Sequence, residues 1–250
     1  MPLYESPAVA LRSRRLGEAD KIVTFFTLRF GKIRAVAKGA FKPKSRFGGR
    51  LEPFVHSNVI AFGKEKADLL RLNSCDVLTH FSALRDDFAR LNRAFVAAEL
   101  LDVCQKERDV NEEGYALALA FLKTLAQETH PDRQDMLLRL FEIKYLAQIG
   151  FRPSLSRCVI CRKPATGTRL GFNAARGGVV CAPCLAGDPW AVAAPAGAVR
   201  LLERGLDTPL ERAGRLTAAG GLMASVERLV GEMVKAHVSR ELRSERFIRL

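Results

Sequence analysis

The amino-acid sequence predicts an α+β multidomain protein, with an N-terminal five-stranded OB-fold barrel followed by an α-helical domain that carries an inserted four-cysteine zinc ribbon. Three observations support this prediction. Short β-prone runs fill the first 80 residues, the apolar period changes from two to nearly four at Phe81, and two C-x2-C pairs lie between residues 158 and 184. We expect an OB-fold nucleic-acid-binding domain over residues 1–80, helical parts over 81–152 and 191–250, and the ribbon over 153–190.

Five short runs rich in β-branched and aromatic residues predict the barrel. They cover approximately residues 9–14, 22–28, 32–38, 51–62 and 69–72. In the third run Ile33, Ala35 and Ala37 alternate with basic residues, so they should share the buried face. A long basic loop separates the third and fourth runs. An OB-fold fits this pattern best, and an SH3-like barrel is the alternative.

Apolar residues at helical spacing predict the helical domain. The first helix is expected to bury one face made of Phe81, Leu84, Phe88, Leu91 and Phe95, continued by Ala98, Leu100 or Leu101, and Cys104. Asn111, Pro131, Pro195 and Leu222 mark the expected starts of further helices, and Gly150 ends the helix that begins at Pro131. We interpret these apolar stripes as core, without a role in binding a cofactor.

The two C-x2-C pairs are Cys158 with Cys161 and Cys181 with Cys184. Each pair makes a tight turn that aims two sulfurs at one point, so two pairs supply the four corners of a tetrahedral zinc site. Because thiolates take all four positions, the expected cofactor is one structural Zn²⁺. The alternatives are disulfides or free thiols. Cys75 and Cys104 lie among apolar residues and are expected to be buried rather than to bind metal.

The N-terminus indicates the compartment. It has neither a basic start nor an apolar run, so no secretory signal is evident and a cytoplasmic protein is expected, in which disulfides are uncommon. No apolar run reaches membrane-spanning length. We expect no membrane partner.

The charge distribution indicates a polyanionic partner, either nucleic acid or an anionic membrane surface. The net charge is +13, with +8 over residues 1–80, −3 over 81–151 and +8 over 152–250. From Lys21 to Leu51 nine basic residues occur without an acidic one, and Phe41 and Phe47 are interleaved with them. This pattern suits a single-stranded nucleic acid, because cations follow phosphates and rings stack on bases. The alternative is a solvated charged loop.

Two other basic groups are weaker candidates for nucleic-acid contact. Arg12, Arg14 and Arg15 belong to the same expected barrel. A second group recurs at every third position near the C-terminus and could form a stripe on the last helix: Arg240, Arg243, Arg246 and Arg249. Glutamates nearby favour an ordinary solvated face for that second group.

The sequence gives little support for an enzyme. The four histidines are scattered, and neither a phosphate-binding glycine loop nor a nucleophile elbow occurs. Glu18 and Asp20 form a close acidic pair, but such a pair in a turn is more often a structural loop than a metal site.

Several segments resemble a known family when they are taken in order. They are Gly17–Asp20 with Gly31-Lys32, Ala37–Ala40, Lys44–Phe47, Leu51–Pro53, the four cysteines and the ending Glu241–Phe247. Over its whole length the chain resembles bacterial RecO-type recombination mediators, which combine an OB domain, a helical domain and a zinc finger.

The resemblance implies a function in DNA repair and recombination without a chemical step. It implies binding of single- and double-stranded DNA, annealing of complementary strands, and cooperation with RecR and single-strand-binding protein to load RecA, with the protein at the nucleoid when DNA is bound. The expected DNA-binding residues are Arg34, Lys38, Phe41, Lys42, Lys44, Arg46 and Arg50, with Phe47 as the alternative to Phe41 for the stacking ring.

Two other functional classes remain as alternatives. A sequence-specific zinc-ribbon regulator would discriminate strongly between DNA sequences. An RNA-binding protein would prefer structured RNA to DNA.

Overall fold

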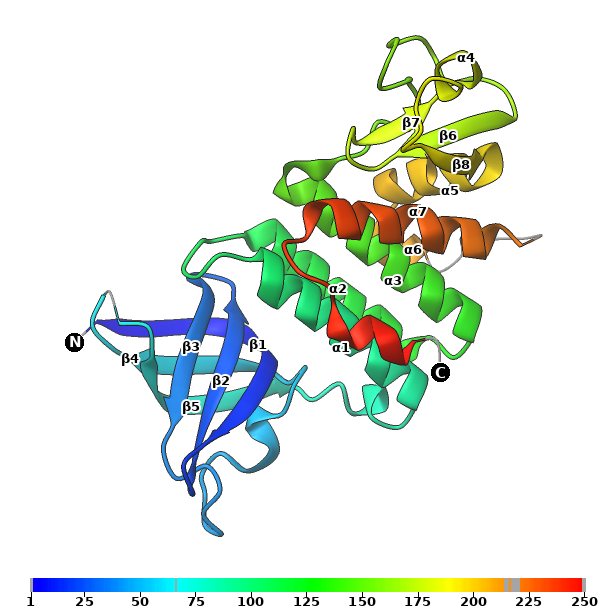
Figure 1. Ribbon diagram of the computed structural model, residues 1–250. Coiled ribbons are helices and arrows are strands. Elements are labelled where there is room, and N and C mark those ends of the chain that lie inside the picture. The colour runs from blue at the N-terminus through cyan, green and yellow to red at the C-terminus, as the bar shows by residue number, and fades with distance from the viewer. Residues whose placement is uncertain (1, 66, 214–215, 217–220, 249–250) are drawn as a thin grey trace. The chain divides into compact units, whose positions relative to one another are not determined.

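The computed structural model describes residues 2–65, 67–213, 216 and 221–248 (Figure 1). The chain divides into two compact units. Unit 1 comprises Met1–Ala126 and Leu242–Leu250, and unit 2 comprises Gln127–Glu241. The first contains a β-barrel with two long helices, and the second contains the remaining long helices and a small cysteine-bearing sheet.

Five strands close the barrel of unit 1. They are β1 (Leu3–Leu16), β2 (Asp20–Thr27), β3 (Gly31–Ala37), β4 (His56–Phe62) and β5 (Leu70–Thr79). Their order around the barrel is β1-β2-β3-β5-β4, with β1 also paired to β4 and β3 parallel to β5. This Greek-key order confirms the predicted OB-type barrel.

Alternation along β3 places its side chains as expected. Ile33, Ala35 and Ala37 point into the barrel core, while Lys32 and Arg34 face outward. The bounds of the strands differ more from the predicted ones than the alternation of side chains does. The fourth strand begins at His56 rather than near residue 51, because residues before it form the 3-10 turn η1 (Gly48–Leu51). That turn carries Leu51 into the barrel core.

Two helices and two short turns complete unit 1. They are η2 (Ser82–Leu84), α1 (Phe88–Cys104), α2 (Glu112–Gln127) and η4 (Arg243–Phe247). Asp87 begins α1, since its side chain accepts hydrogen bonds from the backbone N–H groups of Ala89 and Arg90. The turn η4 packs on α1, where the Ser244 N–H donates to Glu99 Oε2 at 2.8 Å.

The predicted buried face of the first helix was partly wrong. Phe88 is 66% exposed and Phe95 is 37% exposed, whereas the predicted members Leu84, Ala98, Leu100 and Leu101 are buried. Phe81 lies outside the helix in a left-handed conformation with φ of 45°, so the helix begins later than the stripe suggested. The true buried face is built mainly from alanine, valine and leucine, and the phenylalanines lie beside it.

Contacts within unit 1 join the barrel to α1, to α2 and to the segment between these helices. The Lys32 ammonium lies 3.5 Å from the Asp102 carboxylate, and His56 and Tyr115 share a hydrogen bond of 2.9 Å. Gly31 has a φ of 60°, and a β-carbon at this position would overlap the backbone of Asp109. Glycine is therefore required at position 31 both for its conformation and for the close approach.

The variant Gly31→Ala should lose stability for both reasons. We expect the free energy of unfolding to fall by about 2–4 kcal/mol, measured by chemical denaturation. Gly48→Ala is the matched control, because Gly48 also has a positive φ (44°) but no atom within 4 Å of its would-be β-carbon. A loss at Gly31 no larger than at Gly48 would contradict the importance of this contact.

Unit 2 is built on the long helix α3 (Pro131–Leu146), which the π-turn η3 (Ala147–Phe151) extends. It packs against α5 (Ala196–Asp207), α6 (Leu210–Ala213) and α7 (Leu222–His237). Pro131 stands in the first turn of α3, as predicted, and Gly150 adopts a φ of 100° in the turn that ends it.

The small sheet of unit 2 has the order β7-β6-β8. Its members are β6 (Arg169–Asn173), β7 (Gly178–Val180) and β8 (Val192–Pro195), and the short helix α4 (Ala182–Leu185) follows β7. The strand β8 was not predicted. It pairs with β6 in antiparallel register, so the ribbon is three-stranded.

Candidate nucleic-acid interface and metal centre

The basic loop, which we define as residues 38–47, follows β3 and is held by backbone hydrogen bonds. The Phe41 N–H donates to the Ala19 carbonyl at 2.9 Å, and the Gly39 N–H donates to Asp20 Oδ1 at 2.8 Å. Gly39 has a φ of 68°, which lets the chain turn there. The loop is thus fixed to the β1–β2 turn.

The predicted DNA-binding cations fall into two groups. Three of them form ion pairs: Arg34 Nε with Glu107 at 2.8 Å, Lys38 Nζ with Asp20 at 2.7 Å, and Arg50 Nη1 with Asp76 at 3.7 Å. By contrast, Lys42, Lys44 and Arg46 are exposed and have no ion pair within 4.0 Å in the described part of the chain. The cations of the second group can therefore contact a phosphate without first breaking an ion pair.

Hydrogen bonds from Lys38 and from the Gly39 N–H lower the pKa of Asp20. This carboxylate therefore stays ionised and organises the loop, which agrees with the structural interpretation of the acidic pair in this turn. Within that turn Asp20 is half-buried, and Glu18 is exposed.

The two phenylalanines of the loop differ in exposure. Phe41 is 46% exposed, and the cations of Arg15 and Lys21 lie 5.2 and 5.3 Å from its ring centroid. Phe47 is 1% exposed and belongs to the barrel core, so its ring is not available to stack on a base. Of the two rings considered, only Phe41 is presented at the surface.

Arg15 is a basic residue that was ranked second from the sequence but lies beside this loop. Arg15 lies opposite Lys21 in the antiparallel register of β1 and β2. Its side chain donates hydrogen bonds to the Gly17 and Glu18 carbonyls. To predict the position of Arg15 beside the basic loop, one would have needed the register of the β1–β2 hairpin. The neighbouring Arg12 instead pairs with Asp102 at 3.0 Å.

The described C-terminal arginines, Arg240, Arg243 and Arg246, do not lie on the last long helix. The helix α7 ends at His237, and Arg243 and Arg246 lie in the separate 3-10 turn η4. Arg249 lies outside the described residues. The chain leaves α7 in an extended conformation at Val238, so Arg240 and Arg243 lie beyond that helix.

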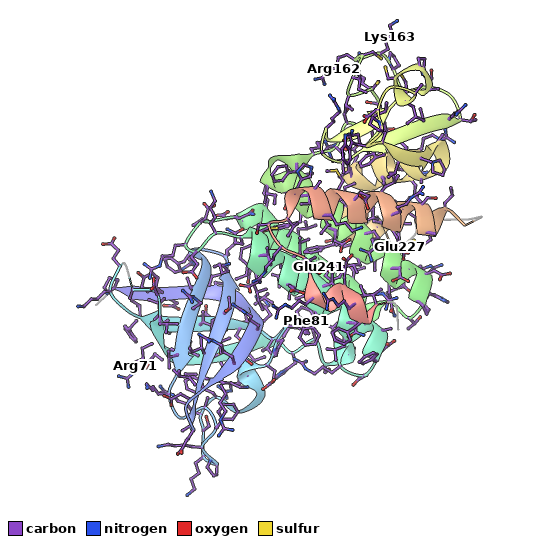
Figure 2. All side chains as sticks on the ribbon, in the orientation of Figure 1. Arg71, Phe81, Arg162, Lys163, Glu227 and Glu241 are labelled. Carbon is purple, nitrogen blue, oxygen red and sulfur yellow. The ribbon has the colours of Figure 1, made fainter. Side chains whose placement is uncertain are left out.

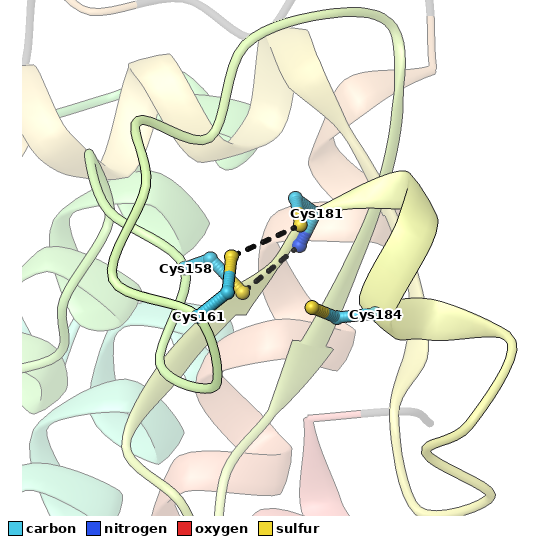
Figure 3. Close-up of side chains that lie close together, drawn as sticks. All are labelled: Cys158, Cys161, Cys181 and Cys184. Carbon is cyan, nitrogen blue, oxygen red and sulfur yellow. Dashed lines mark hydrogen bonds between the residues drawn. The ribbon is translucent and has the colours of Figure 1, made fainter.

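The four cysteines of the two C-x2-C pairs come together in unit 2. Their sulfur atoms all lie within 4.8 Å of one another, and Cys161 Sγ is 3.6 Å from Cys181 Sγ (Figure 3). A Zn–S bond of about 2.3 Å would place tetrahedral ligands about 3.8 Å apart. All four thiols are free rather than joined in disulfides. The donor set and its spacing therefore fit a four-thiolate metal site.

Backbone N–H groups surround the innermost sulfur of this cluster. Burial raises the pKa of Cys158, but hydrogen bonds from the N–H groups of Cys161, Cys181 and Ile160 outweigh it and lower that pKa to about 6. Sharing of hydrogen bonds with Cys181 raises the pKa of Cys184 to about 12. Four thiolates this close repel one another, so a bound cation is needed to hold all of them ionised.

The two remaining cysteines lie elsewhere. Cys75 is buried in the barrel core and Cys104 is half-buried at the end of α1. Burial raises the pKa of Cys104 to about 11, and it also raises that of Cys75. Both lie outside the cluster, and Cys75 is buried as expected, whereas Cys104 is only half-buried.

Two family models match the chain. "Recombination protein O N terminal" matches residues 1–81 and "Recombination protein O C terminal" matches residues 85–246. The chain belongs to the RecO family. Members of this family are non-enzymatic recombination mediators, and this chain is accordingly a DNA repair and recombination protein of that family.

Similar proteins cover nearly the whole chain. The DNA repair protein RecO of Symbiobacterium thermophilum is 35% identical, over 99% of this chain and 97% of its own. The proteins of the same name from Pelotomaculum thermopropionicum and Myxococcus xanthus are 32% and 34% identical, over 99% and 94% of this chain and 94% and 96% of their own. No helix among the described residues is long and apolar enough to span a bilayer.

Proposed function

We propose that the protein is a recombination mediator that binds single- and double-stranded DNA without sequence specificity and anneals complementary strands. With RecR, it helps to load RecA onto DNA covered by single-strand-binding protein. The observation that carries the proposal is the group of exposed cations beside an exposed ring, Lys42, Lys44 and Arg46 with Phe41, on the barrel of a RecO-family chain.

The chemistry of these side chains supports binding without sequence readout. Lysine and arginine neutralise phosphates and release counterions, which gives affinity that is independent of base identity. A phenylalanine ring stacks on any unpaired base. Annealing follows because neutralised strands can approach each other. Arg34, Lys38 and Arg50 join this interface by exchanging their carboxylate partners for phosphates, and the exchange costs least for the exposed Arg50–Asp76 pair.

We further propose one structural Zn²⁺, held by Cys158, Cys161, Cys181 and Cys184. The ion would cross-link the turn before β6 to the start of α4 and leave no position open for water. The residues around it support a structural role, since Val180 and the partly buried Val159, Leu185 and Ala191 pack against the cysteines.

We also retain residues 1–80, 81–152, 153–190 and 191–250 as the proposed functional segments.

Fluorescence anisotropy of labelled single-stranded DNA tests the DNA-binding proposal. We expect tight binding that is equal for two unrelated sequences and that weakens steeply with salt. A structured RNA of the same length serves as the competitor. Strong preference for one DNA sequence, or for the RNA, would contradict the proposal and favour a regulator or an RNA-binding protein.

The two phenylalanines of the basic loop should respond differently to substitution. Phe41→Ala should weaken binding of single-stranded DNA by about 1–3 kcal/mol without changing stability, because it removes a stacking surface. Phe47→Ala should lower the free energy of unfolding by about 3–5 kcal/mol, because it opens a cavity in the barrel core. Anisotropy and thermal denaturation measure the two effects.

Phe88→Ala is the control for this pair, because Phe88 is 66% exposed on α1, away from the basic loop. It should alter neither DNA affinity nor stability appreciably. Equal loss of affinity in the Phe41 and Phe88 variants would remove Phe41 from the interface.

A further inference from the structure

Unit 2 contains an open cavity of about 320 Å³ next to the cysteine cluster. Its walls come from the turn after α3, from the loop that carries Cys158 and Cys161, from the β6–β7 turn and from the end of α7. Among the described residues that line it, Arg152, Arg162 and Arg176 are basic and none is acidic. The cavity therefore presents a concentrated positive charge.

The three arginines are available to a ligand. Arg152 pairs with Asp207 at 2.7 Å, but both side chains are largely exposed, so the pair is weak and exchangeable. Arg176 lies 3.9 Å from Asp188, at the edge of ion-pair range. The Arg162 guanidinium makes no ion pair or hydrogen bond within the described residues.

An aromatic stack forms another wall of the cavity. The rings of Phe151 and His237 lie 4.3 Å apart and nearly parallel, at 19°. His237 Nε2 lies 3.1 Å from the Ala174 carbonyl oxygen, and this hydrogen bond fixes the ring. Phe151 remains 39% exposed. A flat, fixed and partly exposed ring pair beside cations is the surface on which a nucleic-acid base stacks.

Arg162 occupies a backbone position that disfavours a side chain. Its φ is 65°, in the left-handed region, and its N–H donates to the Cys158 carbonyl at 2.9 Å to close the turn. Glycine would adopt this conformation without strain, whereas another residue is strained there. Figure 2 shows Arg162 and Lys163 projecting from this turn. A strained arginine at the mouth of a basic cavity indicates that its side chain has a function.

We propose that this cavity, the arginine pocket, binds a segment of single-stranded DNA. Arg152, Arg162 and Arg176 would contact phosphates, and a base would stack on the Phe151–His237 pair. The inference rests on the proposed DNA-binding function and adds a second strand site, in unit 2, to the one on the barrel. Two sites on one chain would allow it to hold both strands during annealing.

The shape and lining of the pocket favour this ligand over other anions. Its volume is at the lower end of the range for small-molecule sites, about 300–1,000 Å³, which suits one or two nucleotides and excludes a duplex. Its aliphatic lining is limited to small side chains such as Val159 and Ala175, so most of its apolar surface is the flat Phe151–His237 ring pair.

The sharpest variant is Arg162→Gly, because it removes the charge while relieving the backbone strain. We expect unchanged or higher thermal stability and unchanged zinc content. The rate of annealing of complementary oligonucleotides should fall at least tenfold, while affinity for a single oligothymidine strand falls less than threefold because the barrel site remains. Lys163→Ala is the matched control, since it removes the same charge one residue away, outside the pocket lining, and should anneal normally.

Photo-crosslinking of the full chain to oligothymidine carrying 5-iodouracil locates the site directly. We expect mass-spectrometric adducts at Phe151 or His237, lost in Arg162→Gly, besides adducts at the barrel. Adducts confined to the barrel, normal annealing by Arg162→Gly, or binding of an acidic peptide but not oligothymidine at the pocket would overturn the inference while leaving the proposed function intact. Failure of the wild-type protein to bind DNA at all would instead refute the proposed function.

Discussion

Replacement of Lys42, Lys44 and Arg46 by alanine is expected to weaken binding of single-stranded DNA about 100-fold at 0.1 M salt. These residues are exposed and have no ion pair within 4.0 Å in the described structure, so each can release a counterion on meeting a phosphate. With a slope of about −0.7 per contact for a single strand, each contact contributes about fivefold at this salt concentration. The slope of log affinity against log salt should also become shallower by about 2.

The matched control removes three exposed charges from elsewhere on the chain, at Lys123, Arg133 and Arg212. Both triple variants lower the net charge equally, so a purely long-range effect of charge would weaken binding in both. We expect the control to retain affinity within about threefold and to keep most of the salt slope. If the two variants lose affinity to the same extent, general charge rather than the basic loop determines binding.

A third variant ranks the contributions within the interface. Arg34→Ala removes a cation that pairs with Glu107 at 2.8 Å. DNA binding by Arg34 must first replace that partner, so its net gain is smaller than that of an unpaired cation. We expect Arg34→Ala to weaken binding less than Lys44→Ala in the same anisotropy assay. A larger loss of affinity in Arg34→Ala than in Lys44→Ala would indicate that the ion-paired face of β3, rather than the basic loop, contributes most to DNA binding.

Local patterns predicted the parts of the fold that local chemistry determines. Alternation in β3 identified Ile33, Ala35 and Ala37 as buried, because a strand has only two faces. The spacing of the four cysteines identified their cluster, because each C-x2-C turn fixes two sulfurs. Neither prediction required knowledge of which distant segments pack together.

Features that depend on tertiary packing were not predicted. Phe41 and Phe47 have similar sequence surroundings, yet Phe47 packs in the barrel core and Phe41 is exposed at the surface. Phe88 lies on the solvent side of α1 because the smaller residues Ala94 and Ala97 allow close packing on the other side. The sequence pattern shows which residues can be buried, but the neighbouring elements decide which of them are.

The arginine pocket illustrates the same limit for a site. Phe151 follows α3, whereas His237 ends α7, and the two meet only because those helices pack together. Arg162 has a positive φ that could not be inferred from the residue type, since arginine disfavours that conformation. Sites of this kind require coordinates.

Removal of one cysteine from the cluster should have the largest effect on stability. In Cys158→Ala the innermost sulfur is lost, and with it the acceptor of the Cys181 N–H at 3.4 Å. Structural zinc sites contribute about 10–16 kcal/mol of apparent binding energy in zinc-finger peptides, so loss of a ligand should cost unit 2 at least about 5 kcal/mol. We expect zinc content to fall from one ion per chain to nearly none, and the melting temperature to fall by about 20 °C.

Three measurements on the same variant distinguish loss of the metal and of stability in unit 2 from loss of DNA binding. Metal content by mass spectrometry, thermal melting and hydrogen exchange are measured together on the full chain, with Cys104→Ala as the control because Cys104 lies outside the cluster and is half-buried. Loss of amide protection should be confined to Gln127–Glu241, the unit that holds the cysteines. Binding of single-stranded DNA by the barrel should persist, because its basic loop belongs to the other unit. A metal-free protein with wild-type melting and protection would show that the four thiols pack without zinc.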